Sequence, residues 1–216
     1  MSKWICLLLF LFIPLFTFPS QEEWHYLIKW MGIIVGTLDI KEKEESPCLC
    51  LEGNLRTLGI YYLLYPVKDK IQSKIDPKTG KILSLEVNLR EKGYRRKEKR
   101  EFMEGAEFVD PLTLFYLLRF IKEGEREFRV YTHGEIKRIK IIVEKEEELK
   151  IYEDKFATRK LIPELDFQKF HGIVKKIRKV EMWVEKESGI PLKIEAKTSF
   201  GPVTVVLKNR KKWAKK

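Results

Sequence analysis

Cysteines can form disulfides, and cysteines and histidines can bind metal ions, when their spacing in the sequence allows it. Cys48 and Cys50 form a Cys-x-Cys pair, and in an extended strand both thiols point to the same side. A disulfide between them is awkward in that geometry, and a metal site would need ligands that no second cysteine pair supplies. We expect a buried or incidental role for both thiols, with redox or metal chemistry as the alternative.

The histidines, and the catalytic motifs that the sequence lacks, point away from an enzyme. His25, His133 and His171 are each isolated, without His-x-His or Glu-x-x-His spacing. The G-x-S-x-G, Walker A and G-x-G-x-x-G patterns are absent, and the carboxylates are so interleaved with lysine and arginine that no catalytic pair stands out. The sequence therefore predicts no catalysis, no metal and no cofactor, and an unrecognised hydrolase is the rival interpretation.

The densest basic stretch lies between residues 94 and 100 and carries the predicted basic surface. This surface comprises Arg95, Arg96, Lys97, Lys99 and Arg100. On a strand these charges would cover both faces, as they do on an edge strand or a protruding hairpin, where charge resists aggregation. The alternative is a ribbon that contacts lipid headgroups or an anionic polymer.

A set of large apolar side chains is the candidate lining of a ligand cavity. The set comprises Trp24, Tyr26, Trp30, Phe115, Leu118 and Phe120. A curved sheet encloses either a filled interior or a ligand pocket, so we predict that these residues line an apolar cavity. Ordinary core packing is the alternative.

Period-2 alternation of apolar and polar residues predicts the elements that must position these side chains. The cleanest strand is expected over residues 83–89, where leucine and valine alternate with polar residues, and about ten short strands follow from the same pattern. Asp110 before Pro111 predicts the start of one helix. The predicted fold is mainly β: a single curved antiparallel sheet, an open half-barrel or barrel-like, with one buried helix near residues 111–122 plugging the curve.

Residues 1–20 are predicted to be a secretory signal peptide or an uncleaved N-terminal anchor. Residues 5–18 are almost wholly apolar, and as a helix they would span roughly 21 Å, which is short for a bilayer core of about 30 Å but typical of a signal. Phe18 stands where a cleavage site wants a small residue. We therefore expect a periplasmic or exported protein, with a tether to the inner membrane through residues 5–18 as the alternative.

The remainder of the chain shows no linker, repeat or domain boundary. We predict a single β-rich domain over residues 21–208, monomeric, followed by a frayed basic tail over residues 209–216.

Composition and charge narrow the class of partner. Of the 216 residues 35% are charged, while only three are asparagine and three glutamine, a bias typical of thermophile proteins. The formal net charge of +11 attracts acidic partners. Because we expect export, we exclude nucleic acid in favour of anionic lipid, a membrane surface or an anionic envelope polymer. A solvated thermophile surface is the alternative that needs no partner.

Several segments occur in an order that is shared with a known family. They are residues 26–36, 67–76, 110–119 and 182–192, closed by Phe200-Gly201, and they extend over nearly all of the predicted mature chain. Their order resembles the bacterial exported family called domain of unknown function 3108. This resemblance implies an exported, curved antiparallel sheet, similar to the lipoprotein-carrier half-barrels of the Gram-negative periplasm, in which a sheet wraps a helical lid around an acyl-binding cavity. The family brings no assigned catalytic residues.

Together these observations predict an exported, non-enzymatic cell-envelope protein that binds a lipid-like or apolar ligand. The alternative is a structural or scaffolding protein, whose basic surface contacts an anionic envelope polymer or a partner protein. A contiguous apolar cavity of roughly 300 Å3 or more would favour the first hypothesis.

Overall fold

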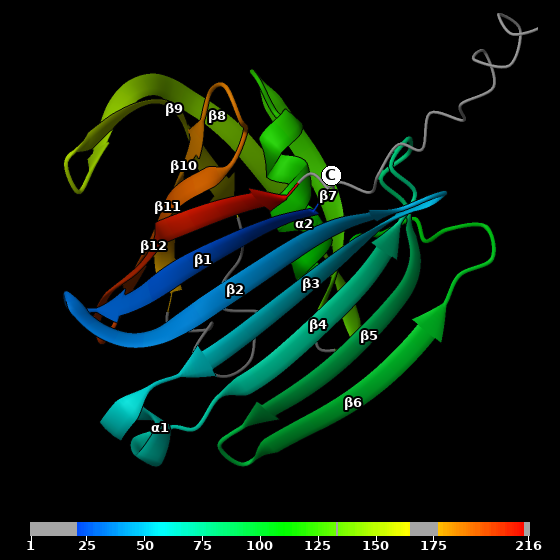
Figure 1. The fold of residues 1–216 in the computed structure, drawn as a ribbon, viewed down its shortest axis with the longest axis horizontal. Coiled ribbons are helices and arrows are strands. Elements are labelled where there is room, and N and C mark those ends of the chain that lie inside the picture. The colour runs from blue at the N-terminus through cyan, green and yellow to red at the C-terminus, as the bar shows by residue number, and fades with distance from the viewer. Residues whose placement is uncertain (1–20, 133, 165–176, 214–216) are drawn as a thin grey trace, which may run out of the picture.

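The computed structural model describes residues 21–132, 134–164 and 177–213, which form one twelve-stranded antiparallel sheet with short helices (Figure 1). The strands are β1 (Gln21–Trp30), β2 (Ile33–Glu45), β3 (Cys48–Thr57), β4 (Lys68–Ile75), β5 (Ile82–Glu91), β6 (Tyr94–Glu101), β7 (Glu125–Thr132), β8 (Glu135–Ile151), β9 (Asp154–Glu164), β10 (Ile177–Glu185), β11 (Pro191–Thr198) and β12 (Gly201–Trp213). The helices are α1 (Gly59–Leu64), α2 (Pro111–Leu117) and the 3-10 helix η1 (Leu118–Phe120).

The sheet consists of two meanders, β1 to β6 and β7 to β12, which are joined in its middle by the first and last strands of the chain. The strand order is β6-β5-β4-β3-β2-β1-β12-β11-β10-β9-β8-β7, so that β1 pairs with β12 and the sheet is open between β6 and β7. The strands curve around α2, and β1 and β12 lie centrally in the sheet (Figure 1). The predicted fold class, a mainly β protein with a curved and open antiparallel sheet, is confirmed.

The inner face of the sheet, which is the face packed against α2, carries the core. Trp24 and Tyr26 of β1 are each only 1% exposed and belong to the larger core cluster together with Leu51. A second inner cluster is centred on Ile141 and Leu161, farther along the sheet. Alternation along the strands places these side chains inside and their polar neighbours outside.

Helix α2 begins as its sequence predicts and ends earlier. The carboxylate of Asp110 accepts hydrogen bonds from the backbone N–H of Leu112 (2.8 Å) and of Thr113 (3.1 Å), the expected N-cap. The α-helix extends only to Leu117, and a single 3-10 turn replaces the rest of the predicted 111–122 helix. Gly53 lies under Leu112, and a Cβ at position 53 would meet Leu112 Cδ1 at 3.2 Å, so the glycine permits the close approach of helix and sheet.

Side chains bridge the open seam between the edge strands β6 and β7. Arg96 Nη2 donates to Tyr131 Oη at 2.9 Å, and the Tyr131 hydroxyl donates to Glu98 Oε1 at 2.8 Å. We call these three residues the seam clasp. β6 and β7 form no backbone ladder in the described sheet, and the edge of β7 pairs instead with Val109: the Val109 N–H donates to the Arg129 carbonyl and the Tyr131 N–H to the Val109 carbonyl, both at 2.8 Å.

The prediction of a frayed basic tail from residue 209 is wrong over residues 209–213. Strand β12 continues to Trp213, which pairs with Gln21 of β1. The basic residues Arg210 and Lys212 form ion pairs with Glu22, and this pairing holds the end of β12 in the sheet.

Two sequence predictions fall partly on residues that the structure does not describe. The signal or anchor over residues 1–20 lies outside the described residues, as do His133 and His171. Within the described ranges, neither α1 nor α2 has the length and apolar character needed to cross a membrane.

Candidate functional site

One end of the half-barrel exposes a concentration of large apolar side chains, which we call the apolar tip. It lies where the β1–β2 turn, α1 and the β11–β12 turn meet. Its members are Trp30, Met31, Ile33, Ile34, Ile60, Tyr62, Leu63, Leu64, Tyr65 and Phe200, which are between 37% and 79% exposed. Contiguous exposed apolar surface on a folded protein marks an interaction site, whereas isolated exposed apolar residues do not.

Hydrogen bonds hold the three segments of the apolar tip together. Trp30 Nε1 donates to the Phe200 carbonyl at 2.9 Å, and the Met31 N–H donates to the Pro202 carbonyl at 2.9 Å. The Trp30 ring also meets the Tyr61 ring edge-on, with 6.4 Å between ring centroids. The tip is therefore a built surface in which each segment supports the next.

The β1–β2 turn presents Met31 at its apex. Met31 has φ of 50° and Gly32 has φ of 84°, which is the left-handed pair that a two-residue hairpin turn demands. A non-glycine residue rarely adopts this conformation. The turn thus holds a large apolar side chain, 62% exposed, in a conformation that asparagine or glycine would adopt at lower cost.

Helix α1 contributes apolar residues that nothing in the described chain covers. Its six residues include none that are buried, and Leu63 at 79% is its most exposed side chain. A helix of this length is unstable alone, and apolar residues on a surface helix normally face a core. The exposed apolar face of α1 is the feature of the tip that ordinary folding does not explain.

Basic side chains border the apolar tip. Lys29 precedes Trp30, and Lys197 precedes the β11–β12 turn. Lys92 lies beside α1, because its Nζ donates to the Leu64 carbonyl at 3.0 Å. We call these three lysines the basic rim.

The residues predicted to line a cavity are divided among separate places. Trp24, Tyr26 and Phe115 pack together in the larger inner cluster, with 5.7 Å between the Tyr26 and Phe115 ring centroids. Leu118 is buried in the second cluster. Trp30 belongs to the apolar tip, and Phe120 is 54% exposed at the end of η1. That the set lines one ligand cavity stays a prediction.

Two grooves in the described part of the chain are polar and differ in character from the predicted apolar cavity. Their volumes are about 710 and 850 Å3. Lysine and glutamate are the commonest residues in the lining of the smaller groove, and lysine and asparagine in that of the larger. Of the predicted cavity residues, only Trp24 touches either groove.

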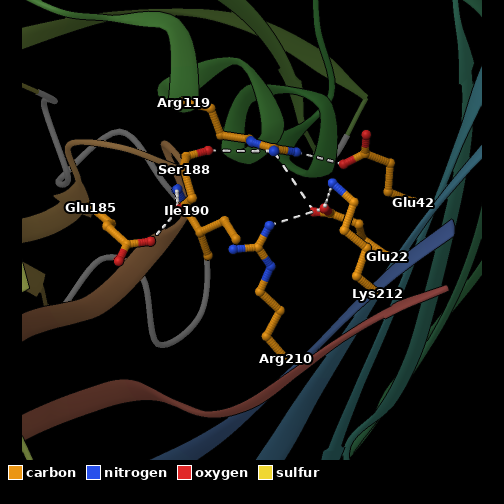
Figure 2. A network of polar contacts seen from close by, with 8 residues as sticks. All are labelled: Glu22, Glu42, Arg119, Glu185, Ser188, Ile190, Arg210 and Lys212. Atoms are coloured by element: carbon orange, nitrogen blue, oxygen red, sulfur yellow. Dashed lines mark hydrogen bonds and ion pairs between the residues drawn. The ribbon is translucent and has the colours of Figure 1, made fainter. Parts of the chain in front are cut away.

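A charge network is buried between η1 and the middle strands (Figure 2). Arg119 Nη1 lies 2.6 Å from Glu42 Oε2, and Arg119 Nη2 lies 3.8 Å from Glu22 Oε2. Glu22 Oε1 also receives Arg210 at 3.0 Å and Lys212 at 3.2 Å. The network therefore ties η1 to β1, β2 and β12.

The protonation behaviour of the two glutamates follows from their partners. Burial raises the pKa of Glu22, but hydrogen bonds from Arg210 and Lys212 outweigh burial and hold that pKa below its usual value. At Glu42 burial dominates and raises the pKa, although Arg119 opposes the change. Neither glutamate lines the two described grooves, so we assign the network a role in fixing η1 on the sheet.

The residues chosen for their chemistry do not converge. Cys48 and Cys50 are free thiols, and Cys50 Sγ donates to Glu45 Oε2 at 3.0 Å. Burial, and then Glu45, raise the pKa of Cys50 to about 11, which disfavours the reactive thiolate. His25 contacts Asp39, and among the described residues no group of three histidine, cysteine or acidic side chains is placed to hold a metal ion.

The predicted basic surface is divided by the sheet. Arg96 joins the seam clasp, and Arg100 lies over the Tyr131 ring, so both face the interior. Arg95 and Lys97 alternate with them on the outer side of β6, and Lys99 lines the smaller outer groove.

Sequence reasoning missed most of the apolar tip and all of the buried network. A signal for the tip is present in the apolar residues on both sides of Gly32 and in the apolar run that ends before Pro66. A signal for the network is Arg119, a lone charge within an otherwise apolar segment.

The open sheet, its short inner helix and the exposed apolar end define a mainly β half-barrel protein. The chain belongs to the family described as protein of unknown function (DUF3108), whose model matches residues 99–208. No curated protein sequence matches the chain.

Several solved structures are similar to this chain at low sequence identity. A beta-barrel-like protein of domain of unknown function DUF1849 from Brucella abortus is similar, with 9% identity, a TM-score of 0.49 and coverage of 92% of this chain and 99% of that one. The hypothetical protein CT021 from Chlamydia trachomatis has 10% identity, a TM-score of 0.41 and 89% coverage of both chains. An outer membrane lipoprotein-sorting protein domain from Vibrio parahaemolyticus has 11% identity, a TM-score of 0.29 and coverage of 90% and 85%.

Proposed function

We propose that this protein is an exported, non-enzymatic envelope protein that binds the surface of an anionic lipid membrane through its apolar tip. The observation that carries the proposal is the apolar tip itself, in which ten exposed apolar side chains from three segments adjoin three lysines. Export rests on the predicted signal or anchor over residues 1–20.

The composition of the tip suits the boundary between lipid headgroups and acyl chains. Tryptophan and tyrosine, here Trp30, Tyr62 and Tyr65, favour that boundary because they combine an apolar ring with a polar group. Leu63, Ile60 and Met31 are the most exposed side chains of the tip, at 79%, 64% and 62%, and full burial of such side chains contributes about 1.5–3 kcal/mol each.

The basic rim gives the tip a preference for anionic lipid. A lysine close to an anionic membrane surface contributes about 1 kcal/mol, and its long stem lets the ammonium reach the headgroups while the apolar residues insert. Lys29, Lys92 and Lys197 are placed for this role.

Binding at the tip requires no rearrangement of the interior. The inner face is occupied by α2 and by the core residues packed under it, with Leu112 in contact with the position of Gly53. A lipid-like ligand between helix and sheet would have to displace these contacts, whereas a membrane surface can meet the tip as it stands.

Vesicle flotation with a matched pair of variants tests the proposal. We expect the tip variant Met31→Asp/Leu63→Asp to bind phosphatidylglycerol vesicles at least tenfold more weakly than the wild type, because two inserting side chains are replaced by charges. The control is Tyr152→Asp/Ile136→Asp, which makes the same charge change at exposed apolar residues elsewhere. Tyr152 has φ of 54°, so it matches Met31 in backbone conformation as well.

Quenching by brominated lipid separates the tip from any contribution of residues 1–20. We expect part of the tryptophan fluorescence of a Trp4→Phe protein to be quenched on vesicles, and Trp30→Phe in that background to remove that part. Equal vesicle binding by the tip and control variants, or quenching that persists in Trp4→Phe/Trp30→Phe, would refute the proposal.

A further inference from the structure

A second surface lies on the outer face of the sheet, opposite α2. A groove of about 850 Å3 extends over β12, β1, β2, β3, β4 and β5. We call it the outer groove. Its outward residues His25 and Asp39 alternate with the inward core residues Trp24, Tyr26 and Ile40, which fixes the face on which the groove lies.

All three asparagines of the protein line the outer groove. They are Asn54, Asn88 and Asn209. Asn209 lies opposite His25, Asp39 lies opposite Asn54, and Lys70 lies opposite Asn88, so that the three amides stand in one row across six strands. With neighbouring strands about 4.8 Å apart, the row is about 24 Å long.

The row of asparagines is unusual in a protein that has so many charged residues and so few amides. Charged residues make up 35% of the chain, whereas asparagine occurs only at these three positions. An amide both donates and accepts hydrogen bonds, and it therefore suits hydroxyl groups, which do the same. The row therefore places three amides, separated by His25, Asp39 and Lys70, across an otherwise charged face.

The carboxylates of the outer groove already have partners. Glu23 receives Lys41 Nζ at 2.9 Å, and Glu52 receives Lys70 Nζ at 3.1 Å. Burial raises the pKa of Glu52, but hydrogen bonds from Asn54 and Lys70 outweigh it and hold that pKa below its usual value. Both carboxylates are thus paired with lysines of the groove itself.

Five cations of the outer groove have no carboxylate partner among the described residues. They are Arg56, Lys68, Arg90, Lys208 and Lys211. Arg56 Nε donates to the Thr37 hydroxyl at 3.1 Å, a neutral partner. Asp39 and Asp69 also line the groove, so its seven lysines and arginines exceed its four carboxylates by three, and the groove keeps an excess of positive charge.

The lining of the groove distinguishes among anionic ligands. Single-stranded nucleic acid binds on aromatic side chains that stack with bases. Trp24 is only 1% exposed, and its ring faces Arg119 on the inner side, so it cannot stack with a ligand in the outer groove. An apolar ligand has no complementary surface among these amides and charges.

We propose that the outer groove binds an anionic polysaccharide laid across the strands. The acidic groups of the polysaccharide pair with the lysines and arginines that have no carboxylate partner, and the hydroxyls of the polysaccharide hydrogen-bond with the row of asparagines. This inference does not depend on lipid binding at the apolar tip, because the two surfaces share no residue.

Affinity electrophoresis in gels that contain polygalacturonate, neutral dextran or no polymer tests the inference. We expect the protein to be retarded by polygalacturonate and not by dextran, with retardation weakened by salt. The groove variant Arg90→Gln/Lys208→Gln/Lys211→Gln should bind polygalacturonate at least tenfold more weakly. The control Arg138→Gln/Lys150→Gln/Lys155→Gln removes the same charges from exposed positions of β8 and β9 and should bind normally.

Two further readouts identify the ligand class and the surface. Asn88→Ala/Asn209→Ala should weaken binding of polygalacturonate while leaving the weaker, charge-driven binding of a polythymidine oligonucleotide unchanged. The groove variant should keep its binding to phosphatidylglycerol vesicles. Equal losses in the groove and control variants, or tighter binding of the oligonucleotide than of polygalacturonate, would overturn the inference.

Discussion

Glu181 is a single carboxylate whose surroundings set its acidity. It accepts hydrogen bonds from Lys160 Nζ at 2.7 Å and Lys179 Nζ at 2.9 Å, and its side chain is 11% exposed. These hydrogen bonds, from Lys160 first, outweigh burial and lower the pKa of Glu181 to about 2. A carboxyl whose pKa is lower in the folded state stabilises the fold above its unfolded pKa.

Replacement of Glu181 by glutamine should remove a pH-dependent part of the stability. We expect Glu181→Gln to lower the free energy of unfolding at pH 7 by about 1 kcal/mol, because two charge-assisted hydrogen bonds are lost. The difference should shrink as the pH falls from about 4.5 towards 2 and vanish below that, where the wild-type carboxyl is protonated in the folded state as well. Urea unfolding at several pH values measures it. Glu153→Gln, which removes an exposed partner of Lys150, should show no such dependence.

Residue-level prediction from the sequence succeeded where alternation was unbroken. Trp24 and Tyr26 share the inner face, as their spacing indicates. Trp30 does not join them, because the pairing of β1 with β2 shifts between Ile28 and Lys29 and the strand then enters the turn. Phe120 reaches solvent because the α-helix has already ended at Leu117. Neither the bulge nor the early helix end has a clear sequence signal.

Arg119 governs how one element, the 3-10 helix η1, is fixed to the sheet. Its guanidinium pairs with Glu22 and Glu42 and lies 4.9 Å from the centroid of the Trp24 ring. Its Nη2 also donates to the Ser188 carbonyl at 3.4 Å, in the β10–β11 turn (Figure 2). One side chain thus connects four elements.

Removal of this guanidinium should destabilise the protein strongly. We expect Arg119→Met to lower the free energy of unfolding by about 3–5 kcal/mol, because Glu42 is left buried without its partner. The double variant Arg119→Met/Glu42→Leu should recover part of the loss. Urea unfolding checks both, and Arg129→Met, at an exposed pair with Glu107, should cost less than about 1 kcal/mol. An equal effect of the two arginine substitutions would contradict the assigned role.

Elements were more predictable than the contacts between them. Alternation indicated the strands, and the pair Asp110-Pro111 located the start of α2, because both signals are local in sequence. The bond from Arg119 to Glu42 spans 77 positions, and nothing local to either residue indicates it. The same holds for the apolar tip, where residues 30–34, α1 and Phe200 meet only through the sheet topology.

At the scale of the whole molecule, the side chains of the seam clasp connect the two edge strands β6 and β7, which share no backbone ladder in the described sheet. Tyr131 of β7 is hydrogen-bonded to Arg96 and Glu98 of β6, and Arg100 lies 4.9 Å from the centroid of its ring. The alternation pattern could not distinguish an open half-barrel from a closed barrel, because closure depends on whether the two edge strands pair. In the described sheet the edge of β7 pairs with Val109, just ahead of α2, and not with β6.

The seam clasp should limit the motion of the two edge strands. We expect Tyr131→Phe to lower the free energy of unfolding by about 1 kcal/mol and to speed amide hydrogen exchange in β6 and β7 while the central strands β1 and β12 stay protected. Tyr152→Phe, at an exposed turn, is the matched control. Unchanged amide hydrogen exchange in both β6 and β7 would show that the seam clasp does not stabilise the two edge strands.

Strand β1 runs from one end of the half-barrel to the other, and we call these two ends the poles of the molecule. This ten-residue strand begins at Gln21 and ends at Trp30, in the apolar tip, so about 30 Å separate its ends. Any segment joined ahead of Gln21 therefore enters at the pole remote from the tip. If residues 5–18 hold the chain in one membrane, the tip faces away from that membrane and towards whatever lies across the intervening space, so the half-barrel would act as a strut between two surfaces.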